Sequence, residues 1–484
     1  MVDQAQTVGA GEVELKRTLG PVHLVALGIG AIIGAGIFVI TGHAAATFAG
    51  PAVVISFAAA GVGCLFAGLC YAEYASMIPV AGSAYTYAYA TLGRLVAWFI
   101  GWNLLLEYLA GAATVAVGWS GYFGDFMRSI GLTLPAALAS APVAVRGVNE
   151  LVLTGAYINL PAVLLIAVVS LVLIVGVHLS ANFNIAMVAI KLGIVILVIV
   201  VGLPHVVPAN LTPFIPPNTG TVGQFGWTGV FRATGVIFFA YIGFDAVSVA
   251  AQEARNPQRD LPIGILGSLF VCTALYMLIS YVVTGIAPYA TLNVAHPVSM
   301  AMEELPATAW LAPYVNVGAV VGLASVVLVL LLGQSRIFYA MARDGLLPPF
   351  FEAIHPRFRT PAIGTIVTGL FAVLAAGVLP LDILGELVSI GTLAAFVAVC
   401  IGILVLRVTH PRARRPFRTP FVWVVAPLGV AICLFMMVFL PLDTWIRLAV
   451  WTAIGLAIYL AYGRHHARAP RWTLEKEPIG GDLS

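Results

Sequence analysis

Charge is the scarcest feature of this 484-residue sequence, because aspartate, glutamate, lysine and arginine together make up only 9% of it. A soluble domain carries about 25% charged residues, since its surface faces water. The hydrophobic share is 61% and the mean hydropathy is +1.03. These values exclude a water-soluble globule of this size and indicate a protein whose surrounding solvent is lipid.

Cysteine is also rare, and the signals of enzyme chemistry are missing. The five cysteines lie within apolar runs, where a thiol behaves as a small hydrophobe, so we expect no disulfide-linked partner subunit. The histidines lack zinc-ligand spacing, and the sequence has no nucleotide-binding loop or nucleophile elbow. We therefore predict no metal site, no cofactor and no enzyme, and the lack of a basic, aromatic-rich segment argues against nucleic-acid binding.

Long apolar runs are what the sequence has in abundance. A bilayer core is about 30 Å thick, so a spanning helix needs roughly 20 apolar residues. The runs are continuous rather than alternating, which excludes membrane-spanning strands. The sequence therefore predicts an all-α polytopic membrane protein with twelve transmembrane helices. They are expected near 22–44, 52–77, 95–124, 154–177, 184–203, 228–250, 264–286, 314–342, 362–379, 384–407, 421–440 and 446–463.

The basic residues predict the orientation. An even number of spans places both termini on one side, and nearly all lysines and arginines fall in the connections on that side. The exceptions are Arg128, Arg146, Lys191, Arg232 and Arg447. Because basic residues favour the cytoplasm, both termini are expected there. The chain then divides into a cytoplasmic segment 1–21, a transmembrane domain 22–463 and a cytoplasmic tail 464–484.

Two of the polar segments on the cytoplasmic side have a distinct character. The internal connection 78–94 is rich in tyrosine and small residues, and it is expected to form a short helix packed under the bundle. The tail after Arg464 is polar enough to be solvated and disordered. The first 20 residues lack an apolar core, so we expect no cleaved signal peptide.

The first predicted span contains five glycines within GIGAIIGAGIFVITG, residues 28–42. Glycine in a helix interior costs about 1 kcal/mol relative to alanine. Close helix packing explains the Gly30–Gly34 pair, but the run Gly34-Ala35-Gly36 favours a helix that unwinds inside the membrane. Such a break frees amide groups that attract a carboxylate and carbonyl groups that attract an ammonium. Exposed backbone at this depth is tolerated only beside a cavity, so the break suits an α-amino acid.

A second break is predicted in the sixth span, where Gly243 is close to the carboxylate of Asp245. Paired interrupted helices are typical of transporters built from two inverted repeats, with a binding site at the membrane midplane. The repeats would cover about 22–203 and 228–407, and the spans in 421–463 would be additional.

Ionisable residues inside the spans are the remaining candidates for chemistry. Intramembrane charges are costly, so they usually face a cavity or form structural ion pairs, and both alternatives stay open for the four found here. These are Glu107, Lys191, Asp245 and Glu386. Lys191 is the most informative, because burial disfavours its charge and its ammonium can replace a metal cation at the carbonyls of a broken helix. Glu73 lies nearer a span end, where we expect it to reach the interface.

Five stretches together give the chain a marked family resemblance. The stretches are GIGAIIGAGIFVITG (28–42), YAEYASMIPVAGSAYTYAYATLG (71–93), LLLEYLAGAATVAVGWSGYF (104–123), GFDAVSVAAQEARNPQRDLPIGI (243–265) and GQSRIFYAMARDGLLPPFF (333–351). Through them the chain resembles the amino acid–polyamine–organocation superfamily, specifically the bacterial relatives of the cationic amino acid transporters. The resemblance implies a five-plus-five inverted-repeat fold with broken first and sixth helices and two extra spans.

The resemblance also implies roles for individual residues. The substrate carboxylate would meet the backbone amides of Ala35, Gly36 and Ile37. Its ammonium would meet carbonyls of Ile32, Phe239, Ala240 and Ile242, and Phe239 would also act as a gate. Lys191 matches a lysine that replaces sodium in proton-coupled members, and Asp245 and Glu107 match acidic positions of the family.

These observations predict a secondary active permease of the bacterial inner membrane that takes up L-amino acids with protons by alternating access. The stretch SVVLVLLLG (325–333), expected to line the side-chain pocket, is almost wholly apolar, so neutral or small substrates are favoured over cationic ones. An amino acid exchanger and a polyamine or amine carrier remain alternatives. A channel is disfavoured, since no filter-like segment repeats.

Overall fold

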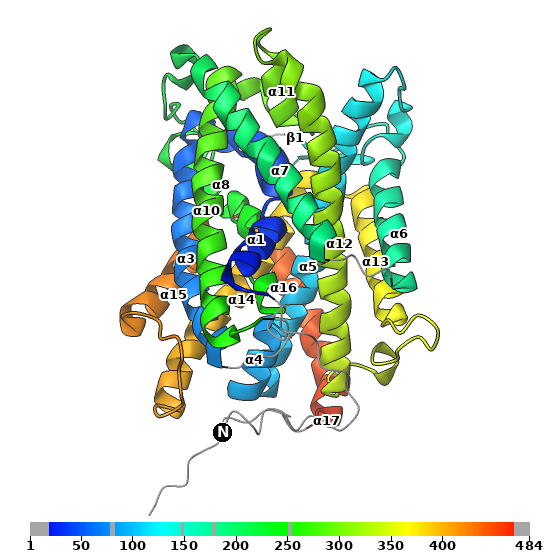
Figure 1. Ribbon diagram of the computed structural model, residues 1–484, viewed down its shortest axis with the longest axis vertical. Helices are drawn as coiled ribbons and strands as arrows, with labels where there is room; N and C mark the ends of the chain where they lie inside the picture. The colour runs from blue at the N-terminus through cyan, green and yellow to red at the C-terminus, as the bar shows by residue number, and fades with distance from the viewer. Residues whose placement is uncertain (1–18, 78–82, 147–149, 177–180, 250–253, 469–484) are drawn as a thin grey trace, which may run out of the picture.

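The computed structural model describes residues 19–77, 83–146, 150–176, 181–249 and 254–468. Long helices running along one direction dominate it (Figure 1). Within these residues seven helical stretches are long and apolar enough to cross a membrane: Gly36–Met77, Arg94–Ser129, Ala186–His205, Pro257–Ile286, Ala309–Arg343, Leu381–Thr409 and Leu442–His466. Shorter apolar helices cover Pro21–Ile32, Leu160–Val175, Ala362–Val378 and Val422–Val438. The predicted helical membrane protein is confirmed, and the count of twelve spans stays a prediction.

The helices follow the predicted order along the chain. They are α1 (Pro21–Ile32), α2 (Thr41–Ala44), α3 (Val53–Met77), α4 (Ser83–Thr91), α5 (Arg94–Ser129), α6 (Leu160–Val175), α7 (Ala181–Gly202), α8 (Gly226–Ile237), α9 (Ala246–Val249), α10 (Pro257–Ile286), α11 (Pro297–Glu303), α12 (Ala312–Arg343), α13 (Ala362–Val378), α14 (Leu381–Thr409), α15 (Val422–Val438), α16 (Leu442–Ile458) and α17 (Arg464–His466). The expected short helix within 78–94 is present as α4, at the lower end of the bundle in Figure 1.

The connection before α6 differs from the prediction. Two short antiparallel strands, β1 (Val143–Arg146) and β2 (Glu150–Leu153), form a hairpin there. The helix begins at residue 160 rather than 154, because the Asn159 side chain caps it by accepting the amide of Ala162 at 3.3 Å. The apolar residues 151–153, directly before the predicted start of this span, lie in a strand.

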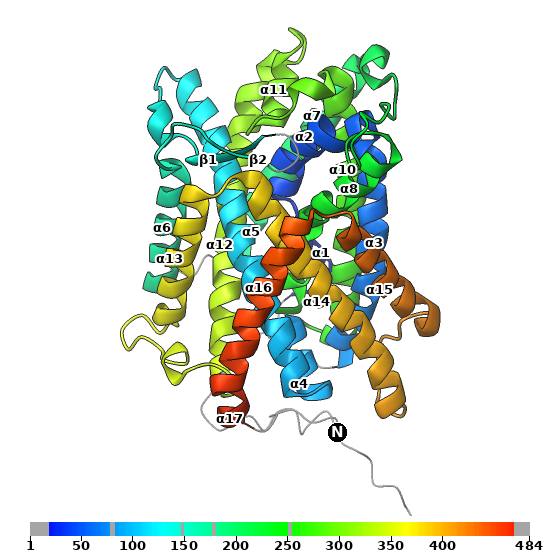
Figure 2. The same ribbon diagram turned by 180° about the vertical axis from the view of Figure 1, so that it is seen from behind.

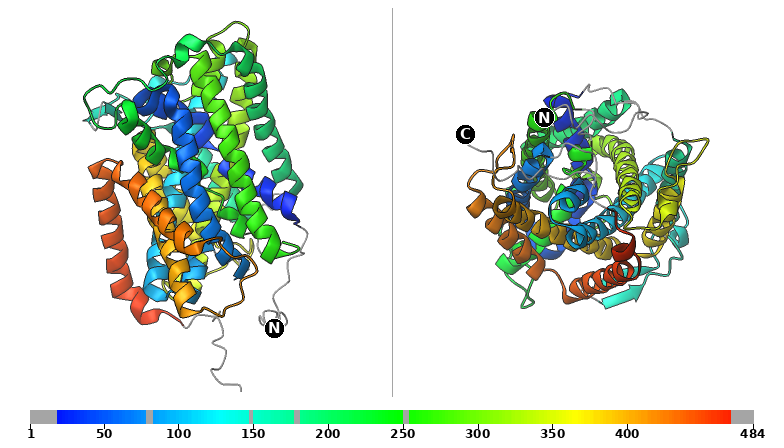
Figure 3. Two further views of the ribbon diagram at one scale, coloured as in Figure 1. Left: turned by 90° about the vertical axis from the view of Figure 1, so that its left-hand side faces the viewer. Right: turned by 90° about the horizontal axis from the view of Figure 1, so that it is seen from below.

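Helix packing divides the centre of the molecule into two groups. The long helix α5 packs along α12 and α14, whereas α3 and α1 pack along α10. Figure 3 shows α3 and α10 side by side, and Figure 2 shows α6 beside α13 at one edge. On α6 the side chains of Leu164, Val168 and Leu171 are exposed, four and three residues apart. Such an exposed apolar stripe suits contact with lipid chains.

Both predicted helix breaks are present, and they meet in space. Helix α1 ends at Ile32, and a π-helical turn begins at Gly36. Helix α8 continues as a 3-10 turn to Tyr241, and α9 begins only at residue 246. A Cβ atom on Gly36 would lie 2.3 Å from the Cα of Ala240. Glycine at position 36 therefore allows the two interrupted helices to touch.

Gly243 likewise allows the segment between α8 and α9 to approach α1 closely. Its φ is +108°, and a Cβ atom there would lie 2.8 Å from the carbonyl oxygen of Ala31. Any other residue would strain the backbone at this positive φ, and its Cβ atom would clash with the backbone of Ala31. Only glycine therefore fits without movement of the chain.

Replacing Gly243 with alanine is expected to destabilise the protein by at least about 1–2 kcal/mol, through the positive φ alone. The loss would appear as a lower apparent melting temperature of the detergent-purified protein. Gly193→Ala serves as the control, because this exposed glycine lies in the ordinary helix α7 and a Cβ atom there would meet nothing within 4 Å. Equal melting temperatures for the two variants would contradict the close approach of the breaks.

Candidate functional site

A small cavity lies between the two helix breaks. Its volume is about 20 Å³, which is little more than one water molecule needs. It is lined by Ala31, Ile32, Gly34, Ala35, Gly36, Val115, Phe239, Ile242, Val326 and Leu330. Five of the seven residues predicted to bind substrate are therefore brought together, while Ile37 and Ala240 do not line the cavity. An amino acid would enter only if the surrounding helices moved apart.

Lys191 of α7 reaches the broken end of α1. Its ammonium donates hydrogen bonds to the carbonyl oxygens of Gly30 and Ile33, the latter at 3.1 Å, and lies 3.5 Å from the hydroxyl of Ser325. The side chain is 1% exposed. No carboxylate in the described part of the chain forms an ion pair with it. Backbone carbonyl groups thus hold the buried end of this side chain.

The facing helix α12 makes room for the lysine. A Cβ atom on Gly322 would lie 3.2 Å from the Cβ of Lys191, closer than most such contacts. Ser325, one turn further along α12, donates to the carbonyl of Gly322 at 2.7 Å, which turns its oxygen toward the lysine as an acceptor. The side chain of Lys191 is therefore closely packed between α1 and α12.

A second side chain ties the two breaks to each other. The hydroxyl of Tyr276 on α10 lies 2.8 Å from the carbonyl oxygen of Ile32 and 2.8 Å from that of Ala240. These are two of the carbonyls predicted to receive a substrate ammonium. The tyrosine ring is fully buried beside Phe57 and Tyr241. Tyr276 was not among the predicted site residues, although a buried tyrosine hydroxyl in an apolar span needs a hydrogen-bond partner.

The amide groups at the break in α1 are not equivalent. The amides of Ile37 and Phe38 donate to the carbonyl of Gly34, at 3.2 and 3.3 Å. Across the break, neither the amide of Ala35 nor that of Gly36 donates to a carbonyl of α1. Ala35 and Gly36 are thus better placed than Ile37 to receive an anionic group, because their amides have no partner in α1 and both residues line the cavity.

The acidic candidates form a separate buried group. Asp245, 3% exposed, accepts a hydrogen bond from the hydroxyl of Tyr108 at 3.0 Å. Glu107, the neighbour of Tyr108 on α5, is 1% exposed, and its Oε2 has no hydrogen-bond partner among the described residues. The carboxyls of Glu107 and Asp245 are close enough to interact electrostatically, but neither lines the cavity.

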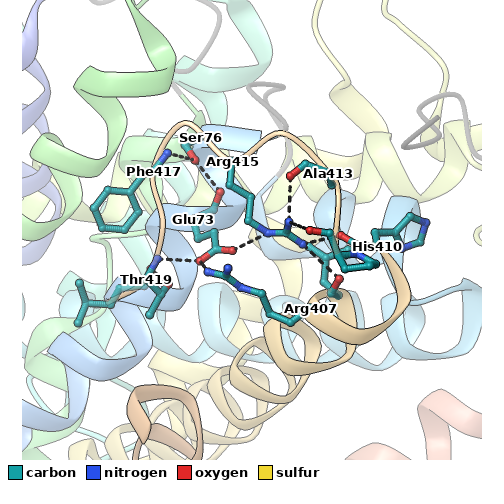
Figure 4. A network of polar contacts seen from close by, with 11 residues as sticks. Glu73, Ser76, Arg407, His410, Ala413, Arg415, Phe417 and Thr419 are labelled. Carbon is teal, nitrogen blue, oxygen red and sulfur yellow. Dashed lines mark hydrogen bonds and ion pairs between the residues drawn. The ribbon is translucent and has the colours of Figure 1, made fainter. Parts of the chain in front are cut away.

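Two other acidic residues have structural partners. Glu386 accepts from Thr444 at 2.7 Å and lies 3.4 Å from Arg447, so the ion-pair alternative holds for it. The prediction for Glu73 was wrong, because this residue is fully buried rather than reaching the interface. Arg407 lies 2.7 Å and Arg415 3.1 Å from its carboxylate (Figure 4). These two guanidinium groups compensate the buried negative charge in place of water.

Replacing Tyr276 with phenylalanine keeps the ring and removes the hydroxyl that links the breaks. Because buried acceptors lose a donor, the folded state should lose about 1–3 kcal/mol of stability, measured by thermal unfolding in detergent. Tyr241→Phe is the matched control: its hydroxyl also donates to a carbonyl, that of Phe57 at 2.7 Å, but this carbonyl lies within the intact helix α3. Equal losses would argue against a special role for Tyr276.

The sequence was compared with known proteins. It matches the family described as "Amino acid permease" over residues 19–460. It is 46% identical to the "Methylthioribose transporter" of Bacillus subtilis (strain 168), over 94% of this chain and 95% of that protein. It is 46% identical to the "Branched-chain amino acid permease BcaP" of the same organism, over 95% and 96%. Identity to the "Cationic amino acid transporter 4, vacuolar" of Arabidopsis thaliana is 39%, over 83% and 65%.

Proposed function

This chain belongs to the amino acid permease family, and from this premise we propose that it takes up neutral L-amino acids together with protons, by alternating access. The observation that carries the proposal is the buried ammonium of Lys191, held by the carbonyl oxygens of Gly30 and Ile33. A lysine in this place supplies the positive charge at the broken helix and can also release a proton, so no sodium ion is needed.

The two breaks offer complementary groups for an α-amino acid. The substrate carboxylate would bind the amides of Ala35 and Gly36, with Ile37 as a weaker third donor. The substrate ammonium would bind carbonyls of Ile32, Phe239, Ala240 and Ile242. A carbonyl oxygen has two lone pairs, so a hydrogen bond from Tyr276 to either carbonyl leaves acceptor capacity at both Ile32 and Ala240.

The side-chain end of the site favours apolar substrates. Val115 from α5 and Val326 and Leu330 from α12 line it, together with Phe239 and Ile242. A guanidinium placed among them without a partner would cost several kcal/mol. The similarity to a named branched-chain amino acid permease agrees with this preference, although other relatives are named cationic amino acid transporters.

Transport would proceed by relative movement of the two helix groups. The twelve-span, inverted-repeat topology and cytoplasmic termini in the inner membrane are part of this proposal. The cavity of about 20 Å³ must enlarge for binding, with Phe239 moving as a gate. As the inner path opens, Lys191 would lose its proton and weaken the broken end of α1. Asp245 and Glu107 would then receive or relay the proton toward the cytoplasm.

Proton coupling is tested in sealed liposomes that contain the purified protein. An inward proton gradient should stimulate the uptake of labelled alanine, and replacing sodium in the buffer should change nothing. Lys191→Met should lower the gradient-driven uptake about tenfold or more, because a charged hydrogen-bonding group is lost. Ser325→Ala removes the lysine contact at 3.5 Å and a hydrogen bond within α12, but leaves both carbonyl contacts of Lys191 in place, so it should retain most of the uptake.

Two outcomes of this experiment would contradict the coupling mechanism. Sodium-dependent uptake would remove the role of Lys191 as the resident cation. Uptake that ignores the proton gradient and requires amino acid inside the liposomes would identify an exchanger. Melting temperatures of both variants should be measured alongside, so that loss of folding is distinguished from loss of coupling.

Substrate preference is a separate prediction. Unlabelled leucine, isoleucine, valine and alanine should each compete with labelled alanine, whereas arginine should compete at least about tenfold more weakly, since an unpaired guanidinium is costly in this pocket. Methylthioribose is included because a relative is named for it. Strong competition by arginine would show that the apolar lining does not set the selectivity, and strong competition by methylthioribose would move the substrate class away from amino acids.

A further inference from the structure

An open groove lies at the beginning of α10, far along the chain from the substrate cavity. Its volume is about 560 Å³. One wall is the first turns of α10 and the residues just before it, and the other is the connection between α14 and α15. The lining residues are Asn256, Gln258, Arg259, Pro262, Ile263, Leu266, Gly267, Pro416 and Phe417. The groove thus combines a polar, cationic end with an apolar floor.

The wall formed by the α14–α15 connection is held firmly in place. The amide of Phe417 donates to the hydroxyl of Ser76 at 3.2 Å, and the amide of Thr419 donates to the carboxylate of Glu73 at 2.8 Å (Figure 4). Arg415, which lies between α14 and this wall, pairs with the same carboxylate and donates to the carbonyl of His410 at 2.7 Å. The groove is therefore a fixed feature between α10 and a connection anchored on α3.

Among the residues that the structure describes, those around the groove carry more positive than negative charge. Arg255 and Arg259 are exposed beside α10, and further exposed arginines follow in the α14–α15 connection. These are Arg412, Arg414 and Arg418. None of the five forms an ion pair with another residue that the structure describes. The nearby carboxylate of Asp260 is buried and accepts the amide of Asn256 at 3.2 Å, and Glu73 is already paired with two arginines.

With α10 spanning a bilayer, the groove would lie at the boundary between lipid headgroups and acyl chains. Helix α10 has 30 residues, so its length of about 45 Å equals a whole bilayer with its headgroups. Its first turn would then lie at headgroup level, with Ile263 about 9 Å deeper than the helix start. Ile263 is 40% and Phe270 76% exposed, seven residues apart on one face. This face is therefore exposed rather than packed against the protein core.

We propose that the groove binds one anionic phospholipid. The headgroup phosphate would lie at Arg259, with the charges of Arg255 and Arg418 nearby, and an acyl chain would follow Ile263 and Leu266 toward Phe270. Basic pockets between helices at a membrane surface suit anionic headgroups, whereas a soluble anion would gain nothing from the apolar floor. A bound lipid would bridge α10 to the connection anchored on α3.

Native mass spectrometry of the full chain in detergent tests this proposal, with dioleoylphosphatidylglycerol as the probe. One molecule should bind per protein, and dioleoylphosphatidylcholine, which has the same chains without net charge, should bind more weakly. Arg259→Gln and Arg418→Gln should each weaken phosphatidylglycerol binding about fivefold. Ile263→Trp keeps every charge but fills the groove, and it should also weaken binding.

Arg464→Gln is the matched control, because this exposed arginine of α17 likewise forms no ion pair with a described residue and does not line the groove. Its affinity for phosphatidylglycerol should be unchanged. Equal weakening in Arg464→Gln, unchanged affinity in Ile263→Trp, or equal binding of phosphatidylcholine would overturn the proposal. Displacement of the lipid by inorganic phosphate would instead identify a site for a soluble anion and would equally overturn it.

Discussion

The hydrogen-bonding needs of interrupted backbone inside a membrane govern this structure. Lipid offers no partners, so an amide or carbonyl released by a helix break must find one within the protein or border a cavity. Lys191 serves the carbonyls of Gly30 and Ile33, and Tyr276 serves those of Ile32 and Ala240. Both side chains come from unbroken helices. The broken segments are therefore stabilised by neighbours that keep regular helical geometry.

The position of the cavity follows from the same arrangement. The breaks belong to α1 and to the α8–α9 segment, which contact α10 and α3, whereas Val115, Val326 and Leu330 come from the group formed by α5 and α12. The cavity thus lies where the two helix groups face each other. A displacement of one group against the other changes its size directly, without requiring any helix to unfold. Tight glycine contacts at the breaks would keep α1 and the α8–α9 segment together during such a movement.

Much of this organisation could be predicted from the sequence, because the signals were local. Apolar runs located the helices to within a few residues in most cases, and the glycines at 34, 36 and 243 located both breaks. Lys191 was recognisable as a costly charge within an apolar run. The hydrogen-bond and ion-pair partners of individual residues could not be predicted, since contacts between distant segments leave no local pattern in the sequence. Glu73 and Arg407 are 334 positions apart, and nothing near Glu73 in the sequence indicates two arginines. The β1–β2 hairpin was missed because its strands have only four residues each.

The hydroxyl of Tyr276 has one proton but lies equally far from two carbonyl oxygens, 2.8 Å from each. At any instant it can donate to one of them only, so the pair of breaks is permanently one donor short. The proton can alternate between Ile32 and Ala240 by a small rotation, yet no rotation satisfies both. At the carbonyls of Ile32 and Ala240 this deficit favours a hydrogen-bond donor, whereas the amides of Ala35 and Gly36 favour an acceptor. The hydroxyl of Tyr276 therefore not only bridges the two breaks but also leaves one carbonyl oxygen free to accept a hydrogen bond.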